Sequence, residues 1–219
     1  MSRLLSFWGS TLGKKVVMGA TGLIMVGFVI LHMLGNLQAF ESAEKFNAYG
    51  AMLHGPLREV VLVLRVVLLV SVALHIVAAV QLTRLDRAAR PVGYARTEPQ
   101  ASTRASRTLR IGGVLLLVFI VYHLLHFTTG NVHPDFVPGE VYHNLVTGLS
   151  RPVVAAFYLV AMVALGLHLY HGVWAGFRSL GVGPASPQPR HRPLALFVAG
   201  VVWLGFSVIP VAVMAGWLK

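Results

Sequence analysis

Apolar side chains dominate five stretches of the chain, and polar or charged residues separate them. Each stretch holds about twenty residues, which at about 1.5 Å per residue in an α-helix is long enough to cross the hydrocarbon core of a bilayer. The pattern therefore predicts an all-α integral membrane bundle of five transmembrane helices, which forms one domain over residues 1–219. The predicted spans are 16–38, 60–82, 110–130, 152–176 and 194–217.

The composition agrees with this class of protein. Of the 219 residues, 56% are hydrophobic and only 11% are charged, and the mean hydropathy is +0.73, which excludes an ordinary soluble domain. The first apolar run is too long for a cleavable signal peptide, so we expect the first helix to stay in the protein. Because the chain has no cysteine, it cannot ligate an iron–sulfur cluster through thiolates or attach a c-type haem covalently.

The net charge of +11 is compatible with binding to nucleic acid or to anionic lipid, and its distribution decides between them. Thirteen Lys and Arg residues lie before the first span, between the second and third, and after the fourth, whereas the other flanks carry four. This is the positive-inside pattern, which predicts a cytoplasmic N-terminus and an outer C-terminus. The Arg-rich segment 83–106 is then a cytoplasmic loop and a candidate docking surface for a soluble partner protein.

One histidine at matched depth in each of the first four runs is the main sign of function: His32, His75, His123 and His168. A histidine in hydrocarbon costs free energy unless something binds it. His32 and His123 lie about 21–24 Å from the predicted cytoplasmic ends of their helices, and His75 and His168 lie level with each other in the inner half. Two imidazoles at one height can bind the iron of a b-type haem from its two faces. The pattern predicts two haem b sites, roughly 12–15 Å apart along the membrane normal.

Two further roles for the histidines stay open. They could form hydrogen bonds between helices or line a proton path, although the apolar runs contain no Asp or Glu that a proton carrier would use. His126 and His171 each lie one helical turn from a proposed ligand. They are alternative ligands, or partners for haem propionates or quinone.

Arg65 lies inside the second run, where a buried guanidinium needs a polar partner, such as a haem propionate or a quinone carbonyl, or must extend toward water. We interpret His54, which follows a predicted short helix over 43–49, as a solvated loop residue. The fifth run has Pro210 and no histidine, and is interpreted as scaffold. No spacing identifies a quinone site; the residues considered for it are Lys14, Lys15, His54, Glu59 and Arg65.

Five ordered motifs support a more specific hypothesis. They are residues 32–37 (HMLGNL), 43–49 (AEKFNAY), 73–79 (ALHIVAA), 122–127 (YHLLHF) and 166–174 (GLHLYHGVW). In this order they closely resemble the cytochrome b558 subunit of succinate dehydrogenase and fumarate reductase, of the type with five helices and two haems. By position, the resemblance implies that the haem ligands are His32, His75, His123 and His168.

The resemblance implies a membrane anchor with two haem b groups in the prokaryotic cytoplasmic membrane. Such a subunit takes electrons from an iron–sulfur subunit, which is fed by a flavoprotein that oxidises succinate, and passes them to quinone, menaquinone in most proteins of this type. It has no dehydrogenase activity without these partners, and the complex can form higher oligomers. The alternatives are a cytochrome b subunit of another respiratory dehydrogenase, such as hydrogenase or formate dehydrogenase, and a non-haem proton carrier.

Overall fold

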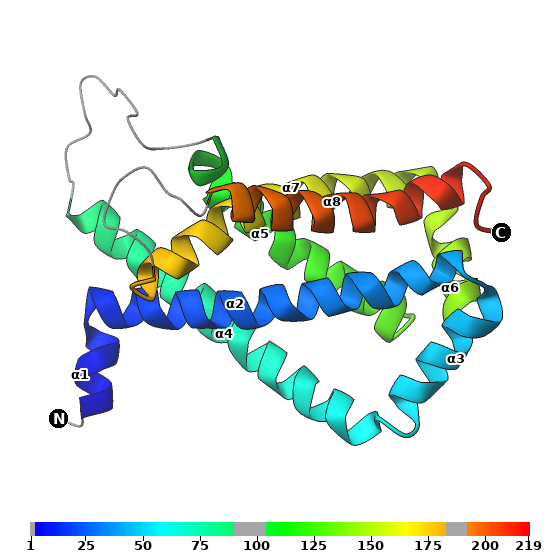
Figure 1. The fold of residues 1–219 in the computed structure, drawn as a ribbon, viewed down its shortest axis with the longest axis horizontal. Coiled ribbons are helices and arrows are strands. Elements are labelled where there is room, and N and C mark those ends of the chain that lie inside the picture. Colours follow the sequence, from blue (N-terminus) through cyan, green and yellow to red (C-terminus); the bar gives the residue numbers. More distant parts are fainter. Residues whose placement is uncertain (1–2, 90–103, 183–191) are drawn as a thin grey trace.

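Five long helices make up most of the computed structural model, which describes residues 3–89, 104–182 and 192–219 (Figure 1). Each is long and apolar enough to cross a membrane, and the described residues contain no strand, so the predicted all-α class and its five spans are confirmed. The long helices are α2 (Thr11–Leu37), α4 (Arg58–Ala88), α5 (Arg104–His123), α7 (Pro152–Ser179) and α8 (Arg192–Met214).

Shorter elements lie at the ends of these helices. A 3-10 turn, η1, extends α2, and a π-helical turn, η2, extends α5. The predicted short helix over 43–49 is present and longer, and His54 is its last residue, exposed and bonded through Nδ1 to the carbonyl of Gly50 at 2.8 Å. The short elements are α1 (Arg3–Gly9), η1 (Gln38–Phe40), α3 (Ala43–His54), η2 (Leu124–Thr128) and α6 (Val141–Leu149).

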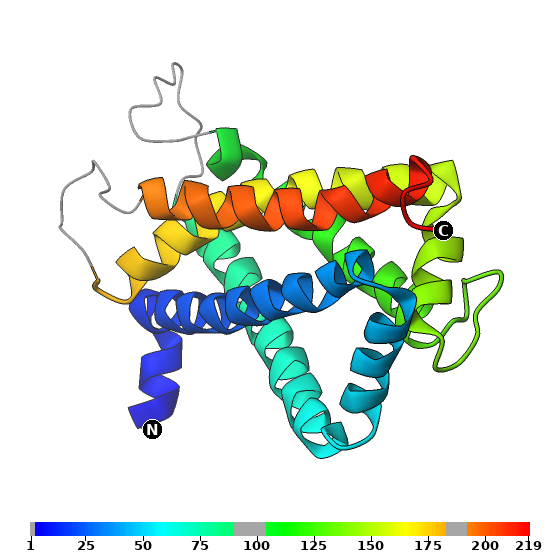
Figure 2. The ribbon, with the colours of Figure 1, turned by 45° about the vertical axis from the view of Figure 1, so that its right-hand side comes forward.

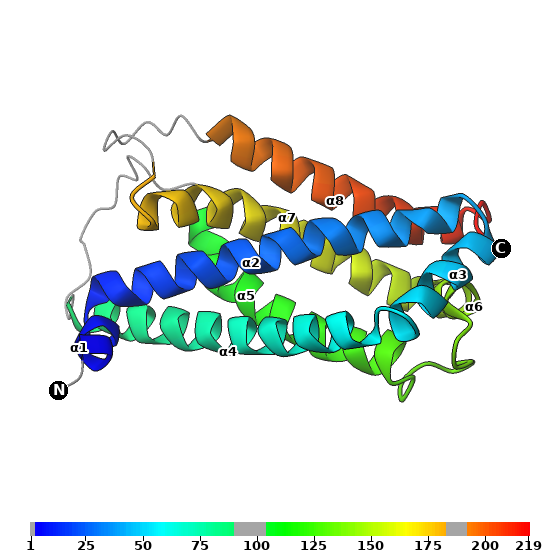
Figure 3. The same ribbon diagram turned by 60° about the horizontal axis from the view of Figure 1, so that its bottom comes forward.

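The chain termini lie at opposite ends of the bundle (Figures 1 and 2), as an odd number of spans requires. We call the end with α1 the N-terminal end and the end with α3 and α6 the C-terminal end (Figure 1). Helices α8, α7 and α2 extend roughly along the same long axis (Figures 1 and 3). Helix α2 packs against α4, α7 and α8, and α7 packs in turn against α5 and α8. Helix α2 is therefore central, with histidine-bearing helices around it.

Helix α4 crosses α2 and diverges from it toward α3 (Figures 1 and 2). Its buried residues, Ser71, Ala78 and Leu82, lie from the middle of the helix onward, while residues 58–70 are mostly exposed. The half of α4 that carries His75 is thus the half that packs against the bundle.

The predicted loop over 83–106 is shorter than expected. Helix α4 continues to Ala88 because 83–88 contain neither proline nor glycine, and α5 already begins at Arg104. Residues 90–103 lie outside the described part of the chain, and with them Pro91, Pro99 and two arginines of the predicted docking loop, Arg90 and Arg96.

Lys14 joins the N-terminal helix α1 to the bundle. Its side chain is only 7% exposed, and Nζ donates to the main-chain carbonyls of Trp8 at 2.8 Å and Gly9 at 2.9 Å. These carbonyls end α1 and have no partner within the helix, so an ammonium group there satisfies them and complements the helix dipole. Lys14 is therefore a cap of α1, which differs from the quinone contact considered from the sequence.

Candidate functional site

The ring of His75 on α4 lies beside the ring of His168 on α7, with centroids 6.2 Å apart and an interplanar angle of 55°. Nδ1 of His75 lies 3.0 Å from the main-chain carbonyl of Met18 and 3.3 Å from the hydroxyl of Thr21, both on α2. A carbonyl accepts only, so Nδ1 carries the proton and Nε2 has a free lone pair. A metal-bound histidine usually has this arrangement, with one ring nitrogen bonded to a protein acceptor and the other free for the metal.

Glycine makes room for this pair on α2. A Cβ built on Gly22 would lie 3.4 Å from Cε1 of His75. On the other side of the pair, Nδ1 of His168 is buried and has no hydrogen-bond partner within the described residues. A buried polar atom without a partner is costly and uncommon, which marks His168 as a residue held for a purpose other than packing.

The ring of His32 on α2 lies beside the ring of His123 on α5, with centroids 5.8 Å apart and an interplanar angle of 83°. Phe28, one turn before His32, stacks on it at 5.3 Å with an interplanar angle of 11°, and Phe206 of α8 lies at 5.8 Å. Asn36 places its amide nitrogen 3.3 Å from Nδ1 of His32. Helix α8 therefore contributes an aromatic side chain to this pair, beyond the scaffold role expected from the sequence.

The two pairs lie at different levels, and two helices give the same separation. On α7, Tyr158 lies beside His123 and precedes His168 by ten residues; on α2, Thr21 lies beside His75 and precedes His32 by eleven. At about 1.5 Å per residue either count gives roughly 15 Å between the pairs along the bundle. The structure thus brings together the residues that the sequence placed at one depth.

The donor set and its geometry fit a haem at each pair. Two imidazole nitrogens that bind one metal ion from opposite sides, each at about 2.0 Å, place their ring centroids roughly 6 Å apart. Both observed separations, 5.8 Å and 6.2 Å, match this value. Each pair offers only two nitrogens, and in the described part of the chain no group of three or more His, Asp or Glu side chains could hold a bare ion. A porphyrin, which brings its own four equatorial nitrogens, suits such a site.

The structure separates the alternative histidines from the two pairs. His126 is 1% exposed and stacks on His133, with centroids 4.9 Å apart, rather than facing His32. His171 packs edge-on against Trp174 at 6.0 Å, and its Nδ1 is buried with no hydrogen-bond partner in the described ranges. His123 and His168 are therefore the ring partners of the other two histidines.

Arg65 lies at the expected depth on α4 but has no partner within the described residues. It is exposed, on the half of α4 that diverges from α2, and has no hydrogen bond or ion pair with any described residue. It also lies roughly 120° around the helix from Ser71, which faces the bundle. Other helices of the chain therefore do not cover Arg65, and a haem propionate or quinone carbonyl as its partner stays a prediction. Lys15, His54 and Glu59 are exposed as well, so the residues considered for a quinone site do not converge.

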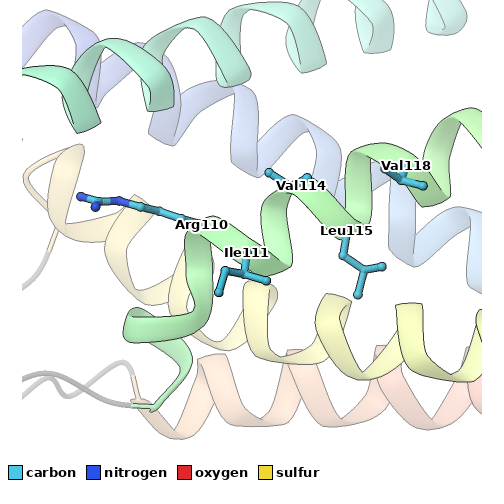
Figure 4. Close-up of a pocket in the computed structure, with 5 residues that line it drawn as sticks. All are labelled: Arg110, Ile111, Val114, Leu115 and Val118. Atoms are coloured by element: carbon cyan, nitrogen blue, oxygen red, sulfur yellow. The ribbon is translucent and has the colours of Figure 1, made fainter.

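A shallow hollow runs along α5 and has no histidine in its lining. Figure 4 shows its five residues on successive turns, with Arg110 at the end nearest the helix start. Ile111, Val114 and Val118 are exposed, as expected for a surface in contact with lipid, and Leu115 is half-buried. The lining residues are Arg110, Ile111, Val114, Leu115 and Val118.

Sequence reasoning missed several residues around the pairs, above all Tyr158, Thr21, Asn36 and Phe206. Tyr158 left a usable signal, because a tyrosine deep in an apolar run needs a hydrogen-bond partner, and six residues into the fourth run it lies level with the third-run histidines. The other three gave none, since their contacts depend on how the helices are rotated.

Comparison with known proteins identifies a family for this chain. A family model described as succinate dehydrogenase/fumarate reductase transmembrane subunit matches residues 86–209, which include α5, α6, α7 and most of α8. No curated protein and no solved structure matches the chain. The match covers more than half of the sequence and includes His123 and His168. With its five spans, the chain is a multi-pass membrane protein that belongs to the transmembrane-subunit family of succinate dehydrogenase and fumarate reductase.

Proposed function

We propose that this anchor subunit binds two haem b groups and carries electrons between an iron–sulfur subunit and a quinone, menaquinone in particular. The proposal rests on the two histidine pairs. The ring centroids within each pair are a similar distance apart, 5.8 Å and 6.2 Å, and the two pairs lie at different levels of the bundle. His32 and His123 hold one haem, and His75 and His168 hold the other. When bound, the haems supply one-electron redox centres at two depths in the membrane.

The chain's own residues fix the ligands for this task. Met18 accepts the Nδ1 proton of His75 and so leaves Nε2 free to bind iron. Phe28 stacks on His32 and restricts its ring to one orientation. The ligands come from four different helices, so the cofactors also hold α2, α4, α5 and α7 together at two levels.

The N-terminal end of the bundle is the docking end for the iron–sulfur partner in this proposal. Exposed arginines gather there, Arg84 and Arg87 at the end of α4, Arg107 at the start of α5 and Arg178 at the end of α7. The positive-inside rule assigns this end to the cytoplasm. Docking there brings an electron donor to the end nearer the His75/His168 pair, and the flavoprotein then binds through the iron–sulfur subunit in the prokaryotic cytoplasmic membrane.

Co-purification with spectroscopy tests the proposal. The tagged subunit, purified from its native membrane in mild detergent, should bring down a flavoprotein and an iron–sulfur protein with succinate dehydrogenase activity. Its reduced-minus-oxidised spectrum should show b-type haem bands at two haems per chain. The control is the double variant His75→Ala with His123→Ala, which removes one histidine from each pair. It should lack both haems. A haem-free wild-type preparation, or one without succinate dehydrogenase activity, would refute the proposal.

A further inference from the structure

Tyr158 on α7 lies between two histidines of α5 and η2. Its side chain is buried, 7% exposed, and its hydroxyl lies 3.3 Å from Nδ1 of His123 and 3.0 Å from Nδ1 of His126. A buried phenol needs hydrogen-bond partners, and both partners here are ring nitrogens. The described part of the chain offers this hydroxyl no other hydrogen bond.

The number of protons in this triad determines the direction of both hydrogen bonds. A phenol has one proton, so it can donate to only one of the two imidazoles and must accept from the other. If His123 binds iron through Nε2, its proton resides on Nδ1, and His123 is the donor. Tyr158 then accepts from His123 and donates to Nδ1 of His126, so the proton of His126 is on Nε2.

We propose that Tyr158 is the positioning residue of the His123 haem ligand, and that it sets the potential of that haem through the chain His123 Nδ1–H to Tyr158 oxygen and Tyr158 O–H to His126 Nδ1. The inference rests on the proposed function, because it requires His123 to bind haem. It also gives His126 a role as the acceptor that orients the phenol.

His126 is fixed firmly enough for this role. It lies in the π-helical turn η2, a feature common at functional sites. His133 stacks on it at 4.9 Å, and a hydrogen bond of 2.9 Å between Nε2 of His133 and the carbonyl of Asn144 holds that ring in turn. Gly148 lies on the same side, where a Cβ would come 2.8 Å from the His126 ring. The acceptor of the Tyr158 proton therefore has little freedom to turn away.

Among the proposed haem ligands, His75 and His123 have a hydrogen-bond acceptor beside Nδ1, and the two acceptors differ. His75 donates to a main-chain carbonyl, whereas His123 donates to a phenol. A hydrogen bond from Nδ1 makes the imidazole a more basic ligand, which favours ferric over ferrous iron. Loss of the Tyr158 hydroxyl should therefore raise the potential of the haem at His32 and His123, and leave that of the other haem unchanged.

The test is a redox titration of the purified complex, followed by its optical difference spectrum. Tyr158→Phe removes the hydroxyl, and Tyr122→Phe is the matched control: its ring also stacks on His126, but no described residue bonds its hydroxyl. The redox component that is missing in His32→Ala identifies the haem held by His32 and His123. Tyr158→Phe should retain both haems and shift only this component to higher potential, while Tyr122→Phe shifts neither.

The inference is overturned if Tyr158→Phe moves neither component, moves both equally, or has no more effect than Tyr122→Phe. If the complex with Tyr158→Phe does not assemble, 3-fluorotyrosine at position 158 is the second test of the inference. It keeps the ring and the hydroxyl, but its oxygen is a weaker hydrogen-bond acceptor. It should shift the same component in the same direction, and no shift overturns the inference. A wild-type complex without haem would instead refute the proposed function, so the two failures are distinguishable.

Discussion

Gly148 on α6 lies directly against the imidazole of His126 in η2: a Cβ at position 148 would come 2.8 Å from Cε1 of that ring and 2.8 Å from Nε2 of His133. Both rings are buried, and neither has a flexible end that could move aside. The short helix α6, outside the predicted spans, thus packs on the histidines near the C-terminal end through a residue without a side chain.

Gly148→Ala should therefore destabilise the fold. Overpacking of this kind costs about 1–3 kcal/mol, more than the roughly 1 kcal/mol that alanine gains over glycine in a helix. Thermal unfolding of the detergent-solubilised subunit, followed by circular dichroism, measures the effect. Gly200→Ala in α8 is the control, because its Cβ would meet no atom within 4 Å. Equal midpoints for the two variants would contradict the packing described here.

Lys14→Met should release α1 from the bundle. The substitution removes two hydrogen bonds from a buried ammonium group to the carbonyls of Trp8 and Gly9. Bonds to charged groups contribute about 1.5–3 kcal/mol each, so amide hydrogen exchange in α1 should speed up by about tenfold or more. Lys15→Met, at an exposed neighbour, should leave exchange unchanged. The cap assignment fails if the two variants exchange alike.

Charge reversal at the N-terminal end should weaken assembly with the iron–sulfur partner. Arg87→Glu with Arg107→Glu is the suitable double variant, since Arg110 lies 3.9 Å from Asp86 and its change would also alter contact between α4 and α5. Recovery of the partner subunits should fall relative to wild type, and the difference should narrow as salt rises because salt screens the charges, while haem content stays the same. Arg58→Glu with Arg151→Glu, at the other end, is the control. Unchanged recovery would argue against docking at this end.

The sequence predicted the parts of this structure that depend on distance along a helix. Apolar run length predicted the five spans, and a fixed rise per residue placed His32 level with His123 and His75 level with His168. Rotation about the helix axis was not predictable in the same way. Arg65 is at the expected depth but on a face that α2 does not cover, because α4 diverges there.

Local details of the site depend on contacts between helices, which the pattern of residues along the sequence does not reveal. His126 lies in a π-helical turn, and Tyr158 lies between His123 and His126 where α7 packs against α5. Lys14, just before the first apolar run, was considered for a quinone site, yet its partners are the carbonyls of the preceding helix. Depth in the membrane was thus predictable, while the partners of each polar group were not.

The pairing of the four histidines is tested most directly by the loss of optical and redox components in their single variants. His32→Ala and His123→Ala should each remove or convert the same haem component and leave the other intact, because their rings lie 5.8 Å apart at one level. His75→Ala and His168→Ala should do the converse. His126→Ala and His171→Ala should retain both haems. If His32→Ala and His75→Ala abolish the same component, the pairing is wrong.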